Sequence, residues 1–366
     1  MAGPEGLYAV VLGVDPILHS GQRLVVATGG LVAGVTLGAG LVRTGNVAEN
    51  RGEIYGGFYG LYLNGDGAAT AVIVNSGTIS SSYSAVVVNG SDDVFTTNTG
   101  VISGITYSYY SYASHVDSIT NHGTMIGHID LGDGNDRYDG RSGVVVGTIY
   151  GNDGDDKFIL GASSEAVDGG FGVDTLDFRT LGAVSVWLSG SIDSTGAGVG
   201  DSFTGIENLA GSIIGADVLV GDGAANLLRG VGGVDTLSGG DGADTLVGGS
   251  GADNLTGGLG NDLFRFDFLP HGGDLISDYG AVPGDNDRFE ISFSAFGGGL
   301  LAGPLQAARF QVRADNQAQD ANDRFIFRTT DATLWFDVNG STAGGLSLIA
   351  DLQAGAVVTS PDILLI

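Results

Sequence analysis

The chain has 366 residues, of which 67 are glycine and none is cysteine, and its formal net charge is −28. An apolar fraction of 43% with only six prolines argues against a collagen-like or disordered chain, so the glycines must serve a periodic fold. The missing cysteines exclude disulfides and thiolate chemistry, and the charge disfavours nucleic acid and anionic membranes while favouring divalent cations. No stretch of 18 or more apolar residues could span a bilayer.

An Asn-x-Gly signature recurs through the first third of the chain. It begins at Asn50, Asn75, Asn98 and Asn121, at intervals of 25, 23 and 23 residues. An Asn-x-Gly turn followed by an inward aliphatic residue, once per coil, is typical of a parallel β-helix with a stacked asparagine ladder. The signature therefore predicts a β-helix in residues 1–130 and a structural role for the asparagines.

Three looser loops, rich in glycine and aspartate, follow in residues 131–211. They read LGDGNDRYD, GNDGDDKFI and GGFGVDTLD and begin at positions 131, 151 and 169. Their spacing suits one acidic loop per coil, with an ordinary turn on the opposite side. We expect calcium ligands among their sixth-position acids and the third-position acids of the first two loops, which are Asp136, Asp156, Asp174, Asp133 and Asp153.

Six nonapeptides then fill residues 212–265 without a gap. Each has Asp or Asn at its sixth position and Leu or Phe at its eighth. The glycine-rich six-residue segment can adopt left-handed and tight-turn conformations, and the last three residues form a minimal strand with one inward apolar side chain. Two units complete one coil, so residues 18 apart stack at about 4.8 Å. The sixth positions are Asp217, Asn226, Asp235, Asp244, Asp253 and Asp262.

Stacked acids place columns of like charge along the solenoid. Two carboxylates about 5 Å apart repel by roughly 3 kcal/mol at an effective dielectric constant near 20. The columns therefore oppose folding unless a cation lies between the carboxylates. Calcium takes oxygen ligands, tolerates irregular geometry and accepts the carbonyls that glycine turns expose. We expect several Ca²⁺ ions to bind the array and to fold it.

The array resembles the RTX, or repeats-in-toxin, proteins, whose repeat reads G-G-x-G-x-D-x-U-x. GGDGADTLV and GGSGADNLT match every defined position, and TGIENLAGS and DLISDYGAVPGDNDRFEIS are also similar to the family. The C-terminal half looks like the RTX domain of serralysin-type proteases, although the His-Glu-x-x-His zinc motif of these enzymes is absent.

The resemblance implies that each ion lies between stacked turns, bound by sixth-position carboxylates and turn carbonyls. The first two nonapeptides lack the double glycine, so sites that use Asp217 or Asn226 should be weak or empty. Further upstream, the loops of Asp93 and Asp117 contain few glycines, and we expect a structural role for both. The ligands implied in the array are the carboxylates of Asp235, Asp244, Asp253 and Asp262 and the carbonyls of Gly240, Gly242, Gly249, Gly251, Gly258 and Gly260.

Residues 266–366 are strand-like and aromatic, and we expect them to cap the last coil. The expected fold is all-β: a right-handed parallel β-helix or β-roll solenoid with single-stranded coils and a C-terminal β-rich cap. The N-terminus lacks the basic and apolar segments of a signal peptide. In RTX proteins the uncleaved C-terminus is the type I secretion signal, so the resemblance implies a secreted, extracellular bacterial protein whose partner is the type I secretion machinery.

The leading functional hypothesis is a non-enzymatic calcium-binding module of the structural or adhesive kind, because no nucleophile, base and orienting group stand out. The alternative is a polysaccharide lyase or epimerase on the N-terminal β-helix, which would need Arg43, Arg51, His115, His122 and a tyrosine such as Tyr107 to meet in one groove. The tyrosines of residues 107–112 could bind a surface polysaccharide, but an aromatic strand also explains them. A pore-forming toxin is disfavoured by the lack of an insertion segment.

Overall fold

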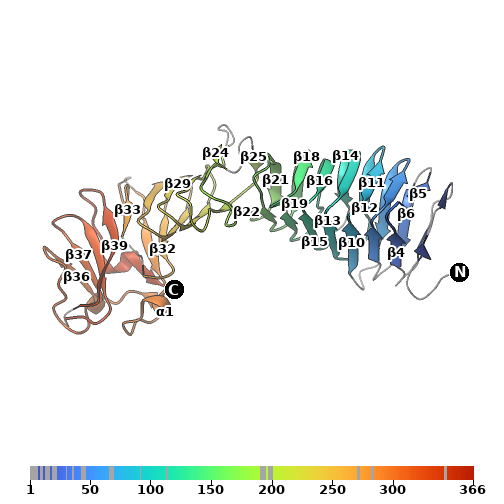
Figure 1. The fold of residues 1–366 in the computed structure, drawn as a ribbon. Helices are drawn as coiled ribbons and strands as arrows, with labels where there is room; N and C mark the ends of the chain where they lie inside the picture. The colour runs from blue at the N-terminus through green and yellow to red at the C-terminus, as the bar shows by residue number, and fades with distance from the viewer. Residues whose placement is uncertain are drawn as a thin grey trace. The chain divides into compact units, whose positions relative to one another are not determined.

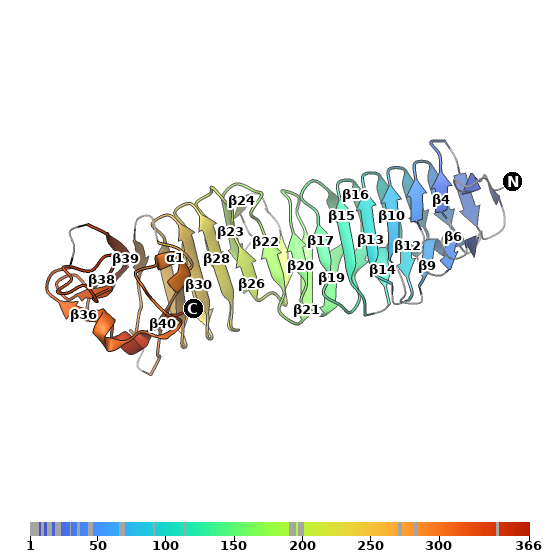
Figure 2. The same ribbon diagram turned by 90° about the horizontal axis from the view of Figure 1, so that it is seen from below.

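The computed structural model describes residues 7–8, 11–12, 17–18, 23–29, 31–34, 37–42, 47–65, 70–90, 92–112, 114–189, 195–196, 201–269, 273–281, 284–341 and 344–366. The chain forms two compact units, Met1–Asp177 with Ala197–Ile206, and Phe178–Gly196 with Glu207–Ile366. Parallel strands dominate both units (Figures 1 and 2), which confirms the expected all-β solenoid. The boundaries inferred from the repeat types, at residues 130, 211 and 265, stay a prediction.

The strands of the first unit stack coil upon coil, shown from blue to green in Figure 1. One sheet contains β1 (Leu7–Tyr8), β4 (Arg23–Val26), β7 (Val47–Asn50), β10 (Ala71–Asn75), β13 (Val94–Asn98), β15 (Asp117–Asn121), β17 (Arg137–Asp139), β20 (Lys157–Ile159) and β22 (Thr175–Asp177). The other contains β2 (Val11–Leu12), β3 (Ile17–Leu18), β5 (Leu31–Gly34), β6 (Leu37–Val42), β8 (Glu53–Gly56), β9 (Tyr59–Asn64), β11 (Thr78–Ser81), β12 (Ser84–Val88), β14 (Val101–Ser111), β16 (Thr124–Asp130), β18 (Val144–Val146), β19 (Thr148–Asp153), β21 (Ala166–Phe171) and β25 (Ser202–Thr204).

The coil of the first unit shortens along the chain, as the repeat spacings predicted. Strand partners are 23 residues apart at Ala71 and Val94, 20 at Arg137 and Lys157, and 18 at Lys157 and Thr175. The pairings are parallel and, apart from a register shift between β14 and β16, in register. Residues at equivalent positions of successive coils therefore lie on the same face.

The predicted asparagine ladder is present in the first unit. Asn50 Nδ2 donates to Asn75 Oδ1 at 2.8 Å, Asn75 Nδ2 to Asn98 Oδ1 at 2.8 Å, and Asn98 Nδ2 to Asn121 Oδ1 at 2.9 Å. All four side chains are buried. Each amide thus connects one coil to the next, which confirms the structural interpretation of this signature.

The nonapeptides of the second unit form its coils, with partners 18 residues apart, such as Thr236 and Asn254. Their eighth-position side chains, from Leu219 to Phe264, are at most 1% exposed and form the core. One sheet contains β26 (Asn208–Ala210), β28 (Leu227–Gly232), β30 (Thr245–Ser250), β32 (Leu263–Phe266), β34 (Arg288–Ile291), β40 (Ile363–Leu365) and β35 (Gly303–Pro304). The other contains β24 (Thr195–Gly196), β23 (Val184–Trp187), β27 (Val218–Val220), β29 (Thr236–Asp241), β31 (Asn254–Leu259), β33 (Asp274–Ile276), β39 (Leu346–Leu352), β38 (Thr333–Asp337), β37 (Phe325–Arg328) and β36 (Phe310–Arg313).

The C-terminal segment covers the last coils of the second unit. β39 pairs with β33, and β40 pairs with β34, so both sheets of the solenoid continue into this segment. β37, β38 and β39 form an antiparallel meander, and Phe296, Phe325 and Phe336 pack together in its core. The short helices are α1 (Phe293–Phe296), η1 (Ala307–Arg309) and η2 (Ser360–Asp362). In the described ranges no helix has the length and apolar character needed to cross a membrane.

Candidate metal sites

The sixth-position side chains of the array form two ladders, one on each sheet of the second unit. In each ladder, the backbone N–H of one sixth position donates to the carboxylate Oδ1 of the sixth position one coil later. The donor and acceptor pairs are Asp217 and Asp235, Asn226 and Asp244, Asp235 and Asp253, and Asp244 and Asp262, with N···O distances of 2.8, 2.8, 2.8 and 2.9 Å.

Both ladders continue beyond the array, to acids that the repeat pattern did not identify. The N–H of Asp253 donates to Asp274 Oδ1, and that of Asp262 donates to Asp287 Oδ1, both at 3.1 Å. The sequence does contain a signal for these two acids. Each stands two positions before a buried apolar residue, Ile276 or Phe289, and this is the spacing between the sixth and the eighth position of a nonapeptide. The loops before them do not have nonapeptide length.

The second carboxylate oxygen of the ladder acids is left without a partner. In the described part of the chain, Oδ2 of Asp235, Asp244, Asp253 and Asp262 is buried and has no hydrogen bond. These residues are at most 1% exposed. Burial raises the pKa of Asp235 to about 7 and those of Asp244 and Asp262 to about 6. A buried, unpartnered carboxylate oxygen is unfavourable unless a proton or a cation meets it.

The first glycine of each turn packs so closely against the carboxylate that no side chain would fit there. A Cβ built on Gly239 would lie 2.2 Å from Asp244 Oδ2 and 2.5 Å from the carbonyl oxygen of Gly257, one coil later. A Cβ on Gly230 would lie 2.3 Å from Asp235 Oδ2 in the same way. A carboxylate oxygen and a carbonyl oxygen from two coils therefore lie close together beside one glycine. Calcium, a hard cation, prefers such oxygen donors.

The six glycines predicted to supply carbonyl ligands all adopt the left-handed region of backbone conformation. Their φ angles lie between 104° and 146°, a range that L side chains rarely adopt. A Cβ on Gly258 would lie 1.8 Å from the carbonyl oxygen of Gly240, and one on Gly260 would lie 1.5 Å from that of Gly242. No group of three or more His, Asp or Glu side chains suited to a metal occurs among the described residues. Carbonyls would therefore have to supply most ligands of an ion bound here.

The two loops that depart from the repeat satisfy their sixth positions internally. Asp217 Oδ2 accepts hydrogen bonds from the backbone N–H of Ser212 at 2.6 Å and from its hydroxyl at 3.0 Å, and Asp217 Oδ1 accepts the N–H of Val184 at 2.8 Å. Asn226 Oδ1 accepts the N–H of Asp222 at 2.9 Å. These side chains need no cation as a partner, and the weak or empty state of sites that use them stays a prediction.

A third ladder runs through the first unit. Besides the predicted sixth-position acids, it includes Asp117. The N–H groups of Asp117, Asp136 and Asp156 donate to Oδ1 of Asp136, Asp156 and Asp174 at 2.7, 2.7 and 2.8 Å. Burial raises the pKa of Asp136 to about 9, and the neighbouring acids contribute; burial raises that of Asp156 to about 6. The structure therefore brings the three predicted sixth-position acids together.

His115 lies at the upstream end of this ladder. Its Nε2 is 3.1 Å from Asp117 Oδ1, and both side chains are buried. This buried contact agrees with the structural role expected for Asp117, but it also adds Asp117 to the ladder. Asp133 and Asp153, by contrast, are exposed on their turns, whereas the ladder carboxylates are buried.

The residues needed for a polysaccharide-acting enzyme are paired separately. Arg51 forms an ion pair with Glu49, and His115 contacts Asp117 in the interior. Tyr107 packs against Tyr110, with ring centroids 4.5 Å apart. Arg43 lies outside the described residues. Among the described residues, Arg51, His115 and Tyr107 thus each contact a different partner.

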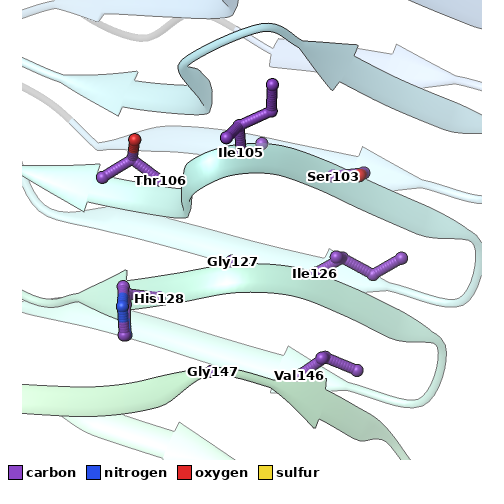
Figure 3. Close-up of a pocket in the computed structure, with 9 residues that line it drawn as sticks. Ser103, Ile105, Thr106, Ile126, Gly127, His128, Val146 and Gly147 are labelled. Carbon is purple, nitrogen blue, oxygen red and sulfur yellow. The ribbon is translucent and has the colours of Figure 1, made fainter.

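A shallow surface pocket lies across β14, β16 and β18 (Figure 3). It has a volume of about 350 Å³ and is lined mainly by small and aliphatic residues, including Ile105, Ile126 and Val146. His128 is its one titratable lining residue, and Nδ1 of His128 accepts the backbone N–H of Thr148 at 3.0 Å. The lining therefore offers no pair of groups for acid and base catalysis.

Comparison with known proteins identifies the repeats. No curated protein is similar in sequence. Among solved structures, the AlgE6R3 subunit of the Azotobacter vinelandii mannuronan C5-epimerase is 28% identical, and the match covers 40% of this chain and 78% of that chain, with a TM-score of 0.26. The family model for the RTX calcium-binding nonapeptide repeat (4 copies) matches residues 147–176, 214–245 and 229–264. Residues 147–264 therefore contain calcium-binding nonapeptide repeats of the RTX type.

Proposed function

We propose that this protein is an extracellular structural or adhesive module that is exported by a type I secretion system and folds when it binds calcium. The observation that carries the proposal is the set of four buried, unpartnered Oδ2 atoms in the two ladders of the array, which belong to Asp235, Asp244, Asp253 and Asp262. Calcium would supply the positive charge that these atoms lack.

The ladders make the metal-free fold unfavourable and the calcium-bound fold favourable. Without an ion, each buried carboxylate must either lose its charge by taking up a proton or remain ionised in a poorly solvated place. An ion that binds only the folded chain adds its binding free energy to the free energy of unfolding. In calcium-poor cytosol the chain would therefore stay largely unfolded, and millimolar calcium outside the cell would fold it.

This coupling suits export through a narrow secretion machinery, because an unfolded chain passes more easily than a folded solenoid. The net charge of −28 keeps the unfolded chain soluble and expanded until calcium neutralises part of it. We infer a structural or adhesive role because most of the described residues form the coils, the ladders and the C-terminal cap. The proposed partners are calcium, the secretion machinery and a surface polysaccharide.

Far-UV circular dichroism of the full chain during a calcium titration tests the proposal. In chelator we expect a spectrum dominated by unfolded chain, and in millimolar Ca²⁺ the spectrum of a β-protein. Magnesium at the same concentration is the matched control, because its demand for near-octahedral geometry suits these irregular sites poorly. A chain with the same β-structure in chelator and in calcium would overturn the proposal.

A further inference from the structure

Two further acids stack in register on the second sheet of the first unit, away from the Asp136 to Asp174 ladder. β21 pairs in parallel with β25, and Val167 lies opposite Phe203. Glu165 and Asp201 each stand two residues before these buried side chains. The backbone N–H of Glu165 donates to Asp201 Oδ1 at 2.7 Å. This is the same contact that joins successive acids in the other ladders.

The repeat pattern of the sequence does not identify this pair of acids. The segment LGASSEAVD contains a single glycine and has Glu in place of Asp at its sixth position. The next acid of the column comes 36 residues later instead of about 18. Register, and not loop composition, therefore places the two carboxylates together.

Both carboxylates are buried and incompletely bonded. Glu165 is 2% exposed, and in the described part of the chain neither of its carboxylate oxygens has a hydrogen-bond partner. Asp201 is 6% exposed, and its Oδ2 also lacks a partner among these residues. Three acidic oxygens are thus withdrawn from water, and the one nearby group that favours the charged form of Glu165 among the described residues is the backbone N–H of Gly161, which lies outside hydrogen-bond geometry but lowers the pKa. A buried, unsatisfied glutamate side chain is an observation independent of the acidic pairing, and it points to a missing ligand.

The basic side chains of residues 137–157 have other acidic partners, because Arg137 and Arg141 pair with Asp139 and Lys157 pairs with Asp177. In the coil before Glu165, the position in register is occupied by Gly147, which offers no charged or polar side chain to the pair.

We propose that Glu165 and Asp201 bind a divalent cation of the calcium class at a site separate from the sixth-position aspartate ladders. One shared proton would satisfy two of the three oxygens and would leave the pair charged. A divalent cation matches the two negative charges and accepts several oxygens at once. Burial and the charge of Asp201 raise the pKa of Glu165 to about 8, which agrees with the lack of a fixed positive partner.

This inference rests on the proposed function for the identity of the ion, but it uses different residues. The test counts calcium bound to the full chain by native mass spectrometry at pH 8, in the wild type, Glu165→Gln and Asp201→Asn. The matched control is Asp168→Asn, which removes a half-exposed carboxylate on the same strand β21. We expect each site variant to bind one ion fewer than the wild type, and the control to bind the wild-type number.

A stability measurement keeps the test valid if one variant folds poorly. Calcium should shift the urea midpoint of Glu165→Gln less than that of the wild type, because one stabilising ion is lost. Unchanged ion counts and unchanged calcium shifts in both site variants would overturn this inference alone. A wild-type chain that binds no calcium would overturn the proposed function as well.

Discussion

The backbone N–H of Asp244 donates a 2.9 Å hydrogen bond to Oδ1 of Asp262, which lies one coil later in the same ladder. This bond holds the Asp262 carboxylate in place and directs its other oxygen toward the first glycine of its own turn, Gly257. Each of the four acids of the last four nonapeptides, from Asp235 to Asp262, thus has one bonded oxygen and one oxygen that no described residue bonds and that is available to an ion. The arrangement links the stacking of coils directly to metal affinity.

Removing the charge of one ladder acid should weaken calcium binding. In Asp244→Asn the shape is kept, but one anionic ligand is lost, so we expect calcium affinity to fall at least about tenfold, equivalent to 1.4 kcal/mol. Isothermal titration calorimetry measures this change. Asp241→Asn, an exposed acid of the same turn, is the control and should bind as the wild type does. Equal affinities in both variants would argue against Asp244 as a ligand.

The metal-free fold should lose stability as the pH rises. The pKa of Asp235 and that of Asp274 are raised by burial from 3.8 to about 7. A carboxyl whose pKa is higher in the folded chain than in the unfolded chain stabilises the fold while it is protonated. This contribution is complete below the pKa of the unfolded chain, about 4, and is lost as the pH rises through the pKa of the folded chain. In chelator, far-UV circular dichroism should therefore show a larger residual fraction of folded chain at pH 5 than at pH 8.

Calcium should reverse this pH trend, since its ligands must be deprotonated. The stabilisation that calcium adds should grow from pH 5 to pH 8. A metal-free chain that is more stable at pH 8 than at pH 5 would contradict the burial of ionisable carboxyls in the ladders.

A methyl group at the first position of a turn should disturb the site. Gly239→Ala places a Cβ against Asp244 Oδ2, and we expect a loss of about 1–3 kcal/mol in the free energy of unfolding with calcium present. The control is Gly223→Ala, since a Cβ on Gly223 meets nothing within 4 Å. Chemical denaturation compares the two variants. Equal stabilities would show that the close approach of Gly239 to Asp244 is not needed.

The asparagine ladder should stabilise the first unit independently of calcium. Asn75→Ala removes the bond that Asn75 accepts from Asn50 and the bond that it donates to Asn98, and leaves buried partners unsatisfied. We expect a loss of about 2–4 kcal/mol on the basis of two broken buried bonds. Thermal denaturation at two calcium concentrations that both fold the chain measures the effect, with Ser80→Ala on a half-exposed position as the control. A loss that changes with the calcium concentration would contradict a purely structural ladder.

The periodic parts of the molecule could be predicted from the sequence, and the interrupted parts could not. Asn-x-Gly spacing and eighth-position leucines such as Leu237 indicate coils and core because each coil repeats the same local geometry. Asp274 and Glu165 escaped prediction because their loops have other lengths or few glycines, so only the strand register reveals their partners. The internal bonds of Asp217 depend on Ser212, a contact that the repeat pattern does not encode.

The most direct test of calcium binding by the ladders is a crystal structure of the full chain grown in calcium, with anomalous differences measured at a wavelength where calcium scatters. We expect peaks beside Oδ2 of Asp235, Asp244, Asp253 and Asp262, between stacked glycine turns. A map without peaks at these atoms, or a folded chain in which they bind only water, would contradict it.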